Sequence, residues 1–105
     1  MNESLEARCQ GSLLRYNWPD GKEPGRLLFS NPASPRRRDL TVRVSRDDGK
    51  TWLVSKTLRE GPGAYSCLTV LPDKSIGCLY ECGRTTPYEK ICFARFSLEW
   101  LEGTK

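Results

Sequence analysis

Apolar and polar residues alternate in short runs along most of the chain. In residues 40–46, Leu40, Val42 and Val44 fall on one face and polar side chains on the other, as in a strand with one buried face. Similar runs occupy residues 12–16, 26–30, 52–58, 65–71, 76–81 and 91–98. Apolar residues do not recur at helical spacing over three turns. Helix is therefore expected only as short turns, near residues 5–9 and 98–101.

Turn residues separate these seven segments. Pro and Gly precede the second segment, Asp47-Asp48-Gly49-Lys50 follow the third, and residues 60–63, Glu-Gly-Pro-Gly, divide the fourth from the fifth. Short strands at this spacing predict an all-β protein. Four segments followed by three are typical of the four-stranded antiparallel blades of a β-propeller. A seven-stranded sandwich of about 100 residues has the same strand number, so both architectures stay open on this count.

Composition narrows the possible chemistry. The 105 residues form one domain of ordinary size, with a net charge of +4 and no histidine. Without histidine, the commonest general base and the commonest metal ligand are missing. Catalysis would have to use carboxylates, Tyr, Cys, Lys or Arg, and we expect no metal and no cofactor. The chain has no apolar run of about 18 residues and no apolar leader segment near Met1, so neither a membrane span nor a signal peptide is expected, and the compartment stays open.

The cysteines do not form a metal-binding pattern. Cys78 and Cys82 are four positions apart, which is not the spacing of a zinc knuckle. The five cysteines at irregular spacings favour buried free thiols, with one disulfide as the main alternative: Cys9, Cys67, Cys78, Cys82 and Cys92.

Positive charge is densest at Arg36, Arg37 and Arg38, directly before Asp39. A run of arginines can bind nucleic acid. This run is short, and no aromatic-rich basic strand adjoins it. We therefore expect a solvated loop or an anion-binding arginine rather than a nucleic-acid partner.

The turn after residues 40–46 carries a specific motif. Its pattern is Ser-x-Asp-x-Gly-x-Thr-Trp, formed by Ser45, Asp47, Gly49, Thr51 and Trp52. The aspartate can accept backbone N–H groups across the turn, the glycine can take a positive φ, and the tryptophan can pack under the loop. This is the Asp-box pattern, which recurs at blade corners of several propeller families. We assign it to folding rather than to acid–base catalysis.

Around this motif the sequence resembles the exo-α-sialidases (neuraminidases) of bacterial and animal type. The matching stretches are residues 9–16, 27–33 with Arg37, 40–43, 63–66 and 76–81. The resemblance implies the last two or so blades of a six-bladed β-propeller. Residues 9–60 would form about one blade and residues 61–98 the final one.

The resemblance also implies roles for three residues. Tyr65 would be the nucleophile, Arg37 would bind the substrate carboxylate, with Arg36 or Arg38 as alternatives, and Glu81 would orient an arginine of the family's triad. A sialoside carries a carboxylate on its anomeric carbon, which arginine binds in bidentate fashion and which would repel a carboxylate nucleophile. Sialidases accordingly use a tyrosine.

The partners implied are sialic-acid-containing glycans, namely glycoproteins, gangliosides and oligosaccharides, with no nucleic acid. The family's acid/base aspartate, its tyrosine-activating glutamate and two arginines have no counterpart between Met1 and Tyr16. The chain is therefore expected to lack N-terminal propeller blades and to be inactive alone. A non-catalytic Asp-box binding or structural module is the alternative, and a basic nucleic-acid-binding β domain is a third hypothesis.

Overall fold

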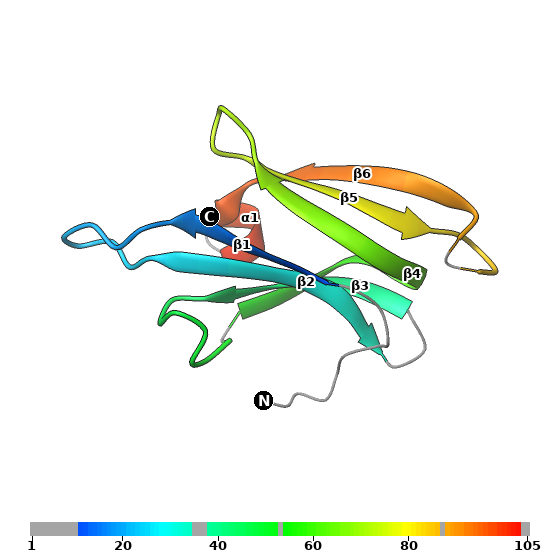
Figure 1. Cartoon of the computed structure of the whole chain (residues 1–105), viewed down its shortest axis with the longest axis horizontal. Helices are drawn as coiled ribbons and strands as arrows, with labels where there is room; N and C mark the ends of the chain where they lie inside the picture. The colour runs from blue at the N-terminus through cyan, green and yellow to red at the C-terminus, as the bar shows by residue number, and fades with distance from the viewer. Residues whose placement is uncertain (1–10, 35–37, 53, 87, 104–105) are drawn as a thin grey trace.

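The computed structural model describes residues 11–34, 38–52, 54–86 and 88–103. These residues form one antiparallel meander in which each strand pairs with the next along the chain (Figure 1). The all-β, antiparallel fold expected from the sequence is confirmed. The elements are β1 (Ser12–Asn17), β2 (Arg26–Ser34), β3 (Arg38–Ser45), β4 (Val54–Val70), β5 (Ile76–Cys82), β6 (Lys90–Phe96) and α1 (Leu98–Glu102).

The strand β4 replaces two of the strands that the sequence predicted. Residues 52–58 and 65–71 were expected to be separated by a turn, but Val54–Val70 is one strand of 17 residues. Gly61, at φ 100°, supplies backbone freedom that does not reverse the chain. The first part of β4 pairs with β3 and the second part, from Gly63, pairs with β5. One strand thus belongs to two sheets.

The two sheets pack against each other through their inner faces. Figure 1 shows the second part of β4 with β5 and β6 lying over β1–β3. Leu28 and Val42 from the first sheet and Ile76 and Cys78 from the second are fully buried. These residues form the core that stabilises both sheets.

The helix α1 ties the two sheets together at the C-terminal end. The Ser97 hydroxyl accepts the Trp100 N–H at 3.0 Å and begins the helix. The Glu102 side chain, only 7% exposed, accepts from Arg26 Nε at 2.9 Å and from Arg46 Nη2 at 3.0 Å. The short helix predicted near residues 98–101 is confirmed, and the turn predicted near residues 5–9 lies outside the described residues.

The turn after β3 is closed by its own side chains. Asp47 accepts the Thr51 N–H at 2.9 Å and the Thr51 hydroxyl at 2.6 Å. The Ser45 hydroxyl donates to Asp47 at 2.8 Å and accepts the Gly49 N–H at 2.7 Å, with Gly49 at φ 90°. The Trp52 ring lies 6.1 Å from the Phe29 ring, centroid to centroid. Ser45, Asp47, Gly49 and Thr51 thus form hydrogen bonds within the turn, and Trp52 packs against Phe29 of β2.

The prediction that favoured free thiols is wrong for one pair of cysteines. Cys82 and Cys92 form a disulfide across β5 and β6, with their Cα atoms 6.4 Å apart. Cys67 and Cys78 are free, and Cys9 lies outside the described residues. The spacing of ten positions between the two cysteines did not predict this pairing, because the pairing depends on the register of the two strands.

We expect Glu102→Ala to lower the free energy of unfolding by about 3 kcal/mol, because it removes the nearer and buried carboxylate of the largely buried Arg26. Glu23→Ala is the matched control, since Glu23 contacts the same arginine at 3.4 Å but is 65% exposed. The control should cost less than about 1 kcal/mol. Urea unfolding of both variants measures the difference, and equal losses would contradict the role of Glu102.

The contribution of the Asp47 turn should depend on pH. Hydrogen bonds from Thr51, and then from Ser45, lower the pKa of Asp47 to about 2, against about 3.9 in an unfolded chain. The carboxylate therefore stabilises the fold above about pH 4, and this contribution is lost as the pH falls toward about 2. We expect Asp47→Ala to lower the melting temperature near neutral pH, and the difference from the parent chain to shrink in acid.

Thermal unfolding followed by circular dichroism at several pH values tests this expectation. Asp20→Ala is the control, because Asp20 lies in an exposed turn where only its backbone is paired with Glu23. A difference between Asp47→Ala and the parent chain that stays constant down to about pH 2 would contradict the assigned cause.

Candidate functional site

The two predicted site residues that the structure describes lie at the same end of the second sheet. Tyr65 is in β4, close to the point where this strand changes sheets, and Glu81 is the penultimate residue of β5. Arg36 and Arg37 lie outside the described residues. Arg38, the alternative, begins β3 with an exposed side chain. The structure therefore brings Tyr65 and Glu81 together.

A β-bulge in β4 sets the direction of the tyrosine. Two residues of β4, Ala64 and Tyr65, lie opposite one residue of β5, Glu81. Such a bulge bends its strand and redirects a side chain, and bulges are frequent beside active sites. Ala64 is fully buried and Tyr65 is 46% exposed. The bulge thus sends the phenol to the outer face of the sheet.

The Glu81 carboxylate holds the bulged backbone. Its Oε1 accepts the Tyr65 N–H at 3.3 Å, within the bulge that interrupts the β4–β5 ladder. No ion pair joins Glu81 to an arginine within the described part of the chain. Because Arg37 is outside that part, the arginine-orienting role of Glu81 stays a prediction.

Tyr65 and Glu81 line a shallow hollow of about 180 Å³ on the outer face. Its other lining residues are Ser66, Cys67, Leu79, Tyr80 and Ile91. Glu81 carries the one charged side chain of this lining, and the remaining walls are largely apolar. A tyrosine needs a neighbouring base to become a nucleophile. The hollow therefore offers a phenol and a carboxylate but not a full acid–base set.

Asp39 is a site-forming residue that the sequence reasoning missed. It is in the left-handed region at φ 61°, which aspartate tolerates better than most residues. Its carboxylate accepts the Gly61 N–H at 2.9 Å. This bond fastens the start of β3 to β4 a few residues before Tyr65. The signal available in the sequence was an aspartate directly before the strand predicted at residues 40–46.

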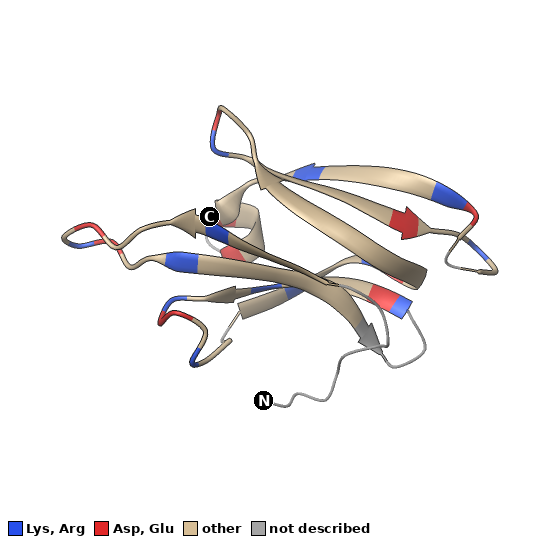
Figure 2. Ribbon diagram, in the orientation of Figure 1, with Lys and Arg blue, Asp and Glu red and all other residues tan. Residues whose placement is uncertain are grey.

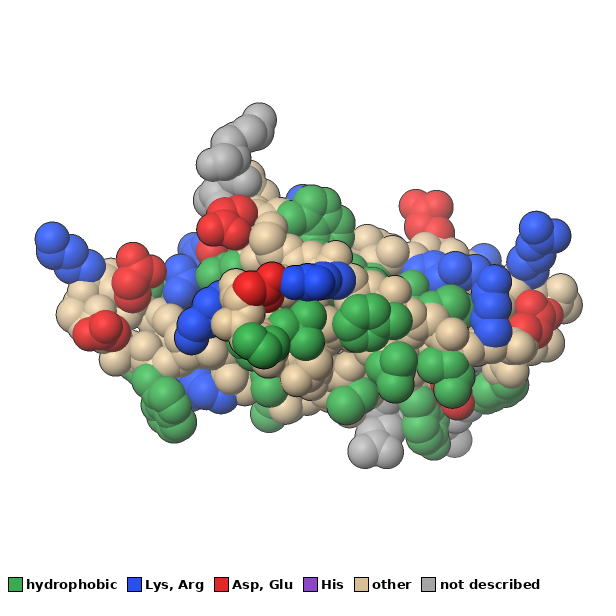
Figure 3. Space-filling view, turned by 90° about the horizontal axis from the view of Figure 1, so that it is seen from above, with side chains coloured by type: hydrophobic (Ala, Val, Ile, Leu, Met, Phe, Trp, Pro, Cys, Tyr) green, Lys and Arg blue, Asp and Glu red, His purple; other side chains and the backbone are tan. Residues whose placement is uncertain are grey.

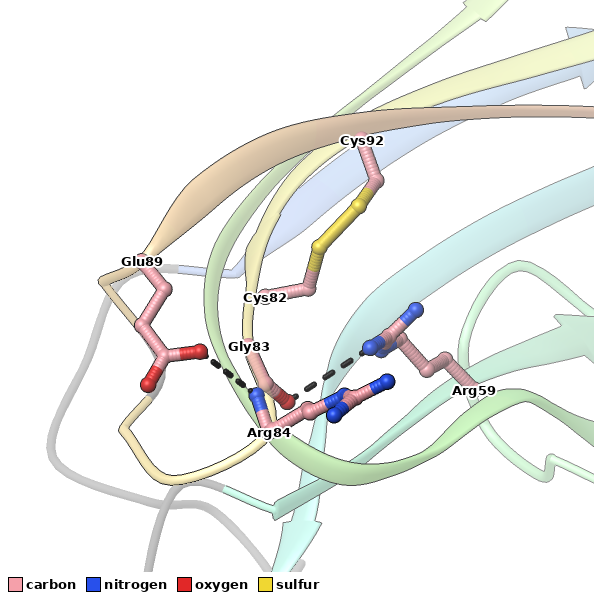
Figure 4. The surroundings of a disulfide bond; sticks show 6 residues. All are labelled: Arg59, Cys82, Gly83, Arg84, Glu89 and Cys92. Carbon is pink, nitrogen blue, oxygen red and sulfur yellow. Dashed lines mark hydrogen bonds between the residues drawn. A yellow bond between two sulfur atoms is a disulfide. The ribbon is translucent and has the colours of Figure 1, made fainter.

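The disulfide is the second feature that was missed, and it adjoins Glu81. Figure 4 shows it at the end of β5, above Arg59 and beside the loop that begins with Gly83. Arg59 Nη2 donates to the Gly83 carbonyl at 3.5 Å. The Glu89 carboxylate accepts the Arg84 N–H at 2.8 Å and closes the loop.

Charge does not gather on one face. In Figure 2 positive and negative residues are interspersed, mostly at strand ends and turns. In residues 11–34, 38–52, 54–86 and 88–103, no three His, Cys, Asp or Glu side chains cluster as metal ligands would. The helix of the described chain is too short to cross a bilayer. The expectation that nucleic acid is not a partner stays a prediction.

Comparison with known proteins gives one consistent result. No family model matches the chain. A sialidase of Micromonospora viridifaciens is 50% identical over 78 residues, which are 73% of this chain and 11% of the relative. An exo-alpha-sialidase of Arthroderma benhamiae is 35% identical over 108 residues, covering 89% of this chain and 26% of the relative.

Solved structures agree with the sequence relatives. A Hadza microbial sialidase superimposes with a TM-score of 0.73 at 36% identity, covering 91% of this chain and 19% of that structure. A leech intramolecular trans-sialidase gives a TM-score of 0.72 at 23% identity, which supports the fold alone. The chain spans 11% and 26% of the length of the two curated relatives above. The chain therefore belongs to the sialidase family and corresponds to a C-terminal part of its members.

Proposed function

We propose that this chain is part of an exo-α-sialidase that releases terminal sialic acid from glycoproteins, gangliosides and oligosaccharides. The observation that carries the proposal is the β-bulge that presents Tyr65 on the outer face, beside the Glu81 carboxylate. It occurs in a chain that is 50% identical to a sialidase over most of its length. The substrate class follows from what these relatives are named for.

The proposed reaction proceeds in two displacements at the anomeric carbon. The Tyr65 hydroxyl gives its proton to a general base while its oxygen forms a bond to that carbon. The bond to the aglycone oxygen breaks, and the leaving oxygen takes a proton from a general acid. Water, deprotonated by the conjugate base of that acid, then displaces the tyrosine oxygen, which regains its proton from the general base, and sialic acid is released. Two inversions retain the configuration. Tyrosine suits this substrate because it avoids placing a second carboxylate against that of the sugar.

Arg37 is the proposed ligand of the substrate carboxylate. A guanidinium can bind a carboxylate through two parallel N–H bonds. Arg37 follows β2 and directly precedes Arg38, the first residue of β3. Asp39 and Gly61 anchor this end of β3 beside β4. Arg38, the residue after Arg37, pairs with Pro62 of β4, three residues before Tyr65.

The remaining catalytic groups are proposed to belong to other blades of a longer protein. The hollow beside Tyr65 contains Glu81 as its one charged residue, which leaves no general acid for the leaving group. An aspartate acid, a glutamate that activates the tyrosine and two further arginines are needed to complete the site. We therefore propose that the 105-residue chain alone does not hydrolyse sialosides.

The outer face of the second sheet supports the idea of missing blades. Leu79 is 49% exposed, Ile91 is 69% exposed and Phe93 is 56% exposed, and all three lie on this face of β5 and β6. Figure 3, which looks down on β5 and β6 from the top of Figure 1, shows hydrophobic side chains gathered side by side. A face of this kind normally packs against another sheet. We propose that a further blade covers it.

The nucleophile can be tested once the missing blades are supplied, either as a longer gene product or as a co-expressed fragment. We expect Tyr65→Phe to reduce kcat for a fluorogenic sialoside by about a thousandfold or more, because the covalent step loses its oxygen. Tyr88→Phe is the matched control and should leave kcat within about twofold. Near-normal turnover by Tyr65→Phe would contradict the proposal. Binding of sialosides by a complete but inactive parent protein would favour the non-catalytic module.

If a further blade covers the outer face, a substitution on that face should destabilise the protein with all blades more than the chain alone. In the chain alone, Phe93→Ser should change the free energy of unfolding by no more than about 0.5 kcal/mol, because the side chain is largely solvated. In the protein with all blades, the same change should cost about 3 kcal/mol. Trp18→Ser, at the exposed β1–β2 hairpin, serves as the control. Equal effects of Phe93→Ser in both contexts, measured by urea unfolding, would contradict a covering blade.

A further inference from the structure

The disulfide and the candidate site share one strand end. Cys82 is the last residue of β5 and directly follows Glu81. In the ladder between β5 and β6, Tyr80 pairs with Cys92 and Cys82 pairs with Lys90. The disulfide thus runs diagonally across the two strands and spans the position of Glu81.

The two features lie on opposite faces of the sheet. Cys82 is fully buried on the inner face, and Cys92 packs against the core from the same side. Glu81 lies on the outer face, where its carboxylate accepts the Tyr65 N–H at 3.3 Å. A covalent bond on one face therefore holds the backbone from which the carboxylate extends on the other.

On its β4 side, this end of β5 has few other contacts. The β4–β5 ladder ends at the pair formed by Gly63 and Cys82, and the bulge interrupts it just beside this pair. The bond from Arg59 to the Gly83 carbonyl is long, at 3.5 Å, and bonds of that length are weak. Strand ends with few contacts open locally at low cost. On the other side, the ladder to β6 continues through Glu81 and Ile91 to Cys82 and Lys90. The disulfide adds a covalent bond between these two strands next to Glu81.

We propose that the Cys82–Cys92 disulfide is a positioning element that keeps Glu81 against the backbone of Tyr65, so that breaking it makes the site sensitive to thiol reductants. The relevance to catalysis rests on the proposed role of Tyr65. A dithiol reductant supplies two electrons and two protons. Its thiolate attacks the half-buried Cys92 sulfur, the Cys82 sulfur leaves, and the products are two protein thiols and the cyclic disulfide of the reductant.

The two free thiols of the described residues do not compete with this step. Cys67 is exposed and pairs with Leu79 on the outer face, so the sheet separates it from the disulfide. Cys78 is on the inner face, but burial raises its pKa to about 12 and keeps it from forming an attacking thiolate. Within residues 11–34, 38–52, 54–86 and 88–103, the oxidised and reduced chains therefore differ at one bond.

Amide hydrogen exchange on the 105-residue chain tests the positioning directly. Reduction by dithiothreitol, verified by mass spectrometry, should accelerate exchange of the Tyr65 amide about tenfold or more. The Thr51 amide, in the distant turn after β3, should be unaffected. An unchanged Tyr65 amide would overturn the proposal. Equal acceleration at Tyr65 and Thr51 would also overturn it, because the disulfide would then stabilise the whole fold rather than this site.

Variants separate positioning from general stability. The double variant Cys82→Ser, Cys92→Ser should exchange like the reduced chain and be insensitive to reductant, whereas Cys67→Ser should respond like the parent. In Glu81→Ala the Tyr65 amide should already exchange rapidly, and reduction should add little, because both changes act through one contact. Fully additive effects would show that the disulfide does not act through Glu81.

The activity of the protein with all blades gives an independent readout. Reduction should lower kcat several-fold with KM changed by less than about twofold, and reoxidation should restore it. If that protein proves inactive before reduction, the proposed function fails, while the amide measurements still decide the role of the disulfide. An active enzyme whose kcat ignores reduction of this bond would overturn the link to catalysis.

Discussion

The candidate site depends on β4 remaining one strand while it passes from one sheet to the other. Every backbone N–H and C=O of a strand needs a partner, and β4 finds them first on β3 and then on β5. The change of partner requires an unusual backbone at Gly61, whose N–H is taken by the Asp39 carboxylate. The bulge at Tyr65 follows directly. A local break in regular pairing is thus what frees the tyrosine to face outward.

Contacts elsewhere in the fold stabilise β4 on both sides and offset the cost of its irregular pairing. The inner faces of the two sheets bury a shared apolar core. Glu102 adds a largely buried ionic contact to Arg26 and Arg46 between the C-terminal helix and the first sheet. The Asp47 turn satisfies its own polar groups. The outer face has no such partner within the described chain, and it is there that the hollow and the exposed apolar residues lie.

Membership of the sialidase family bears on how the tyrosine and the glutamate on the outer face are interpreted. A phenol beside a carboxylate, in a largely apolar hollow, is a poor catalyst without a general acid and a base for the tyrosine. Tyr65 and Glu81 fit the proposal that several blades each contribute residues to one active site. The exposed apolar face and the partial set of catalytic groups both support our proposal that other blades complete the sheet packing and the active site.

The sequence by itself determined the strand segments, the self-contained turn at Asp47, the short helix near the C-terminus and the family. These depend on local alternation, turn residues and motif spacing, which neighbouring residues encode. The tertiary structure alone decided that two predicted strands are one, that Cys82 and Cys92 are bonded, and that Glu81 contacts the backbone of Tyr65. Each of these depends on how neighbouring strands pair and in which register, and register is set by which faces pack together in the folded protein.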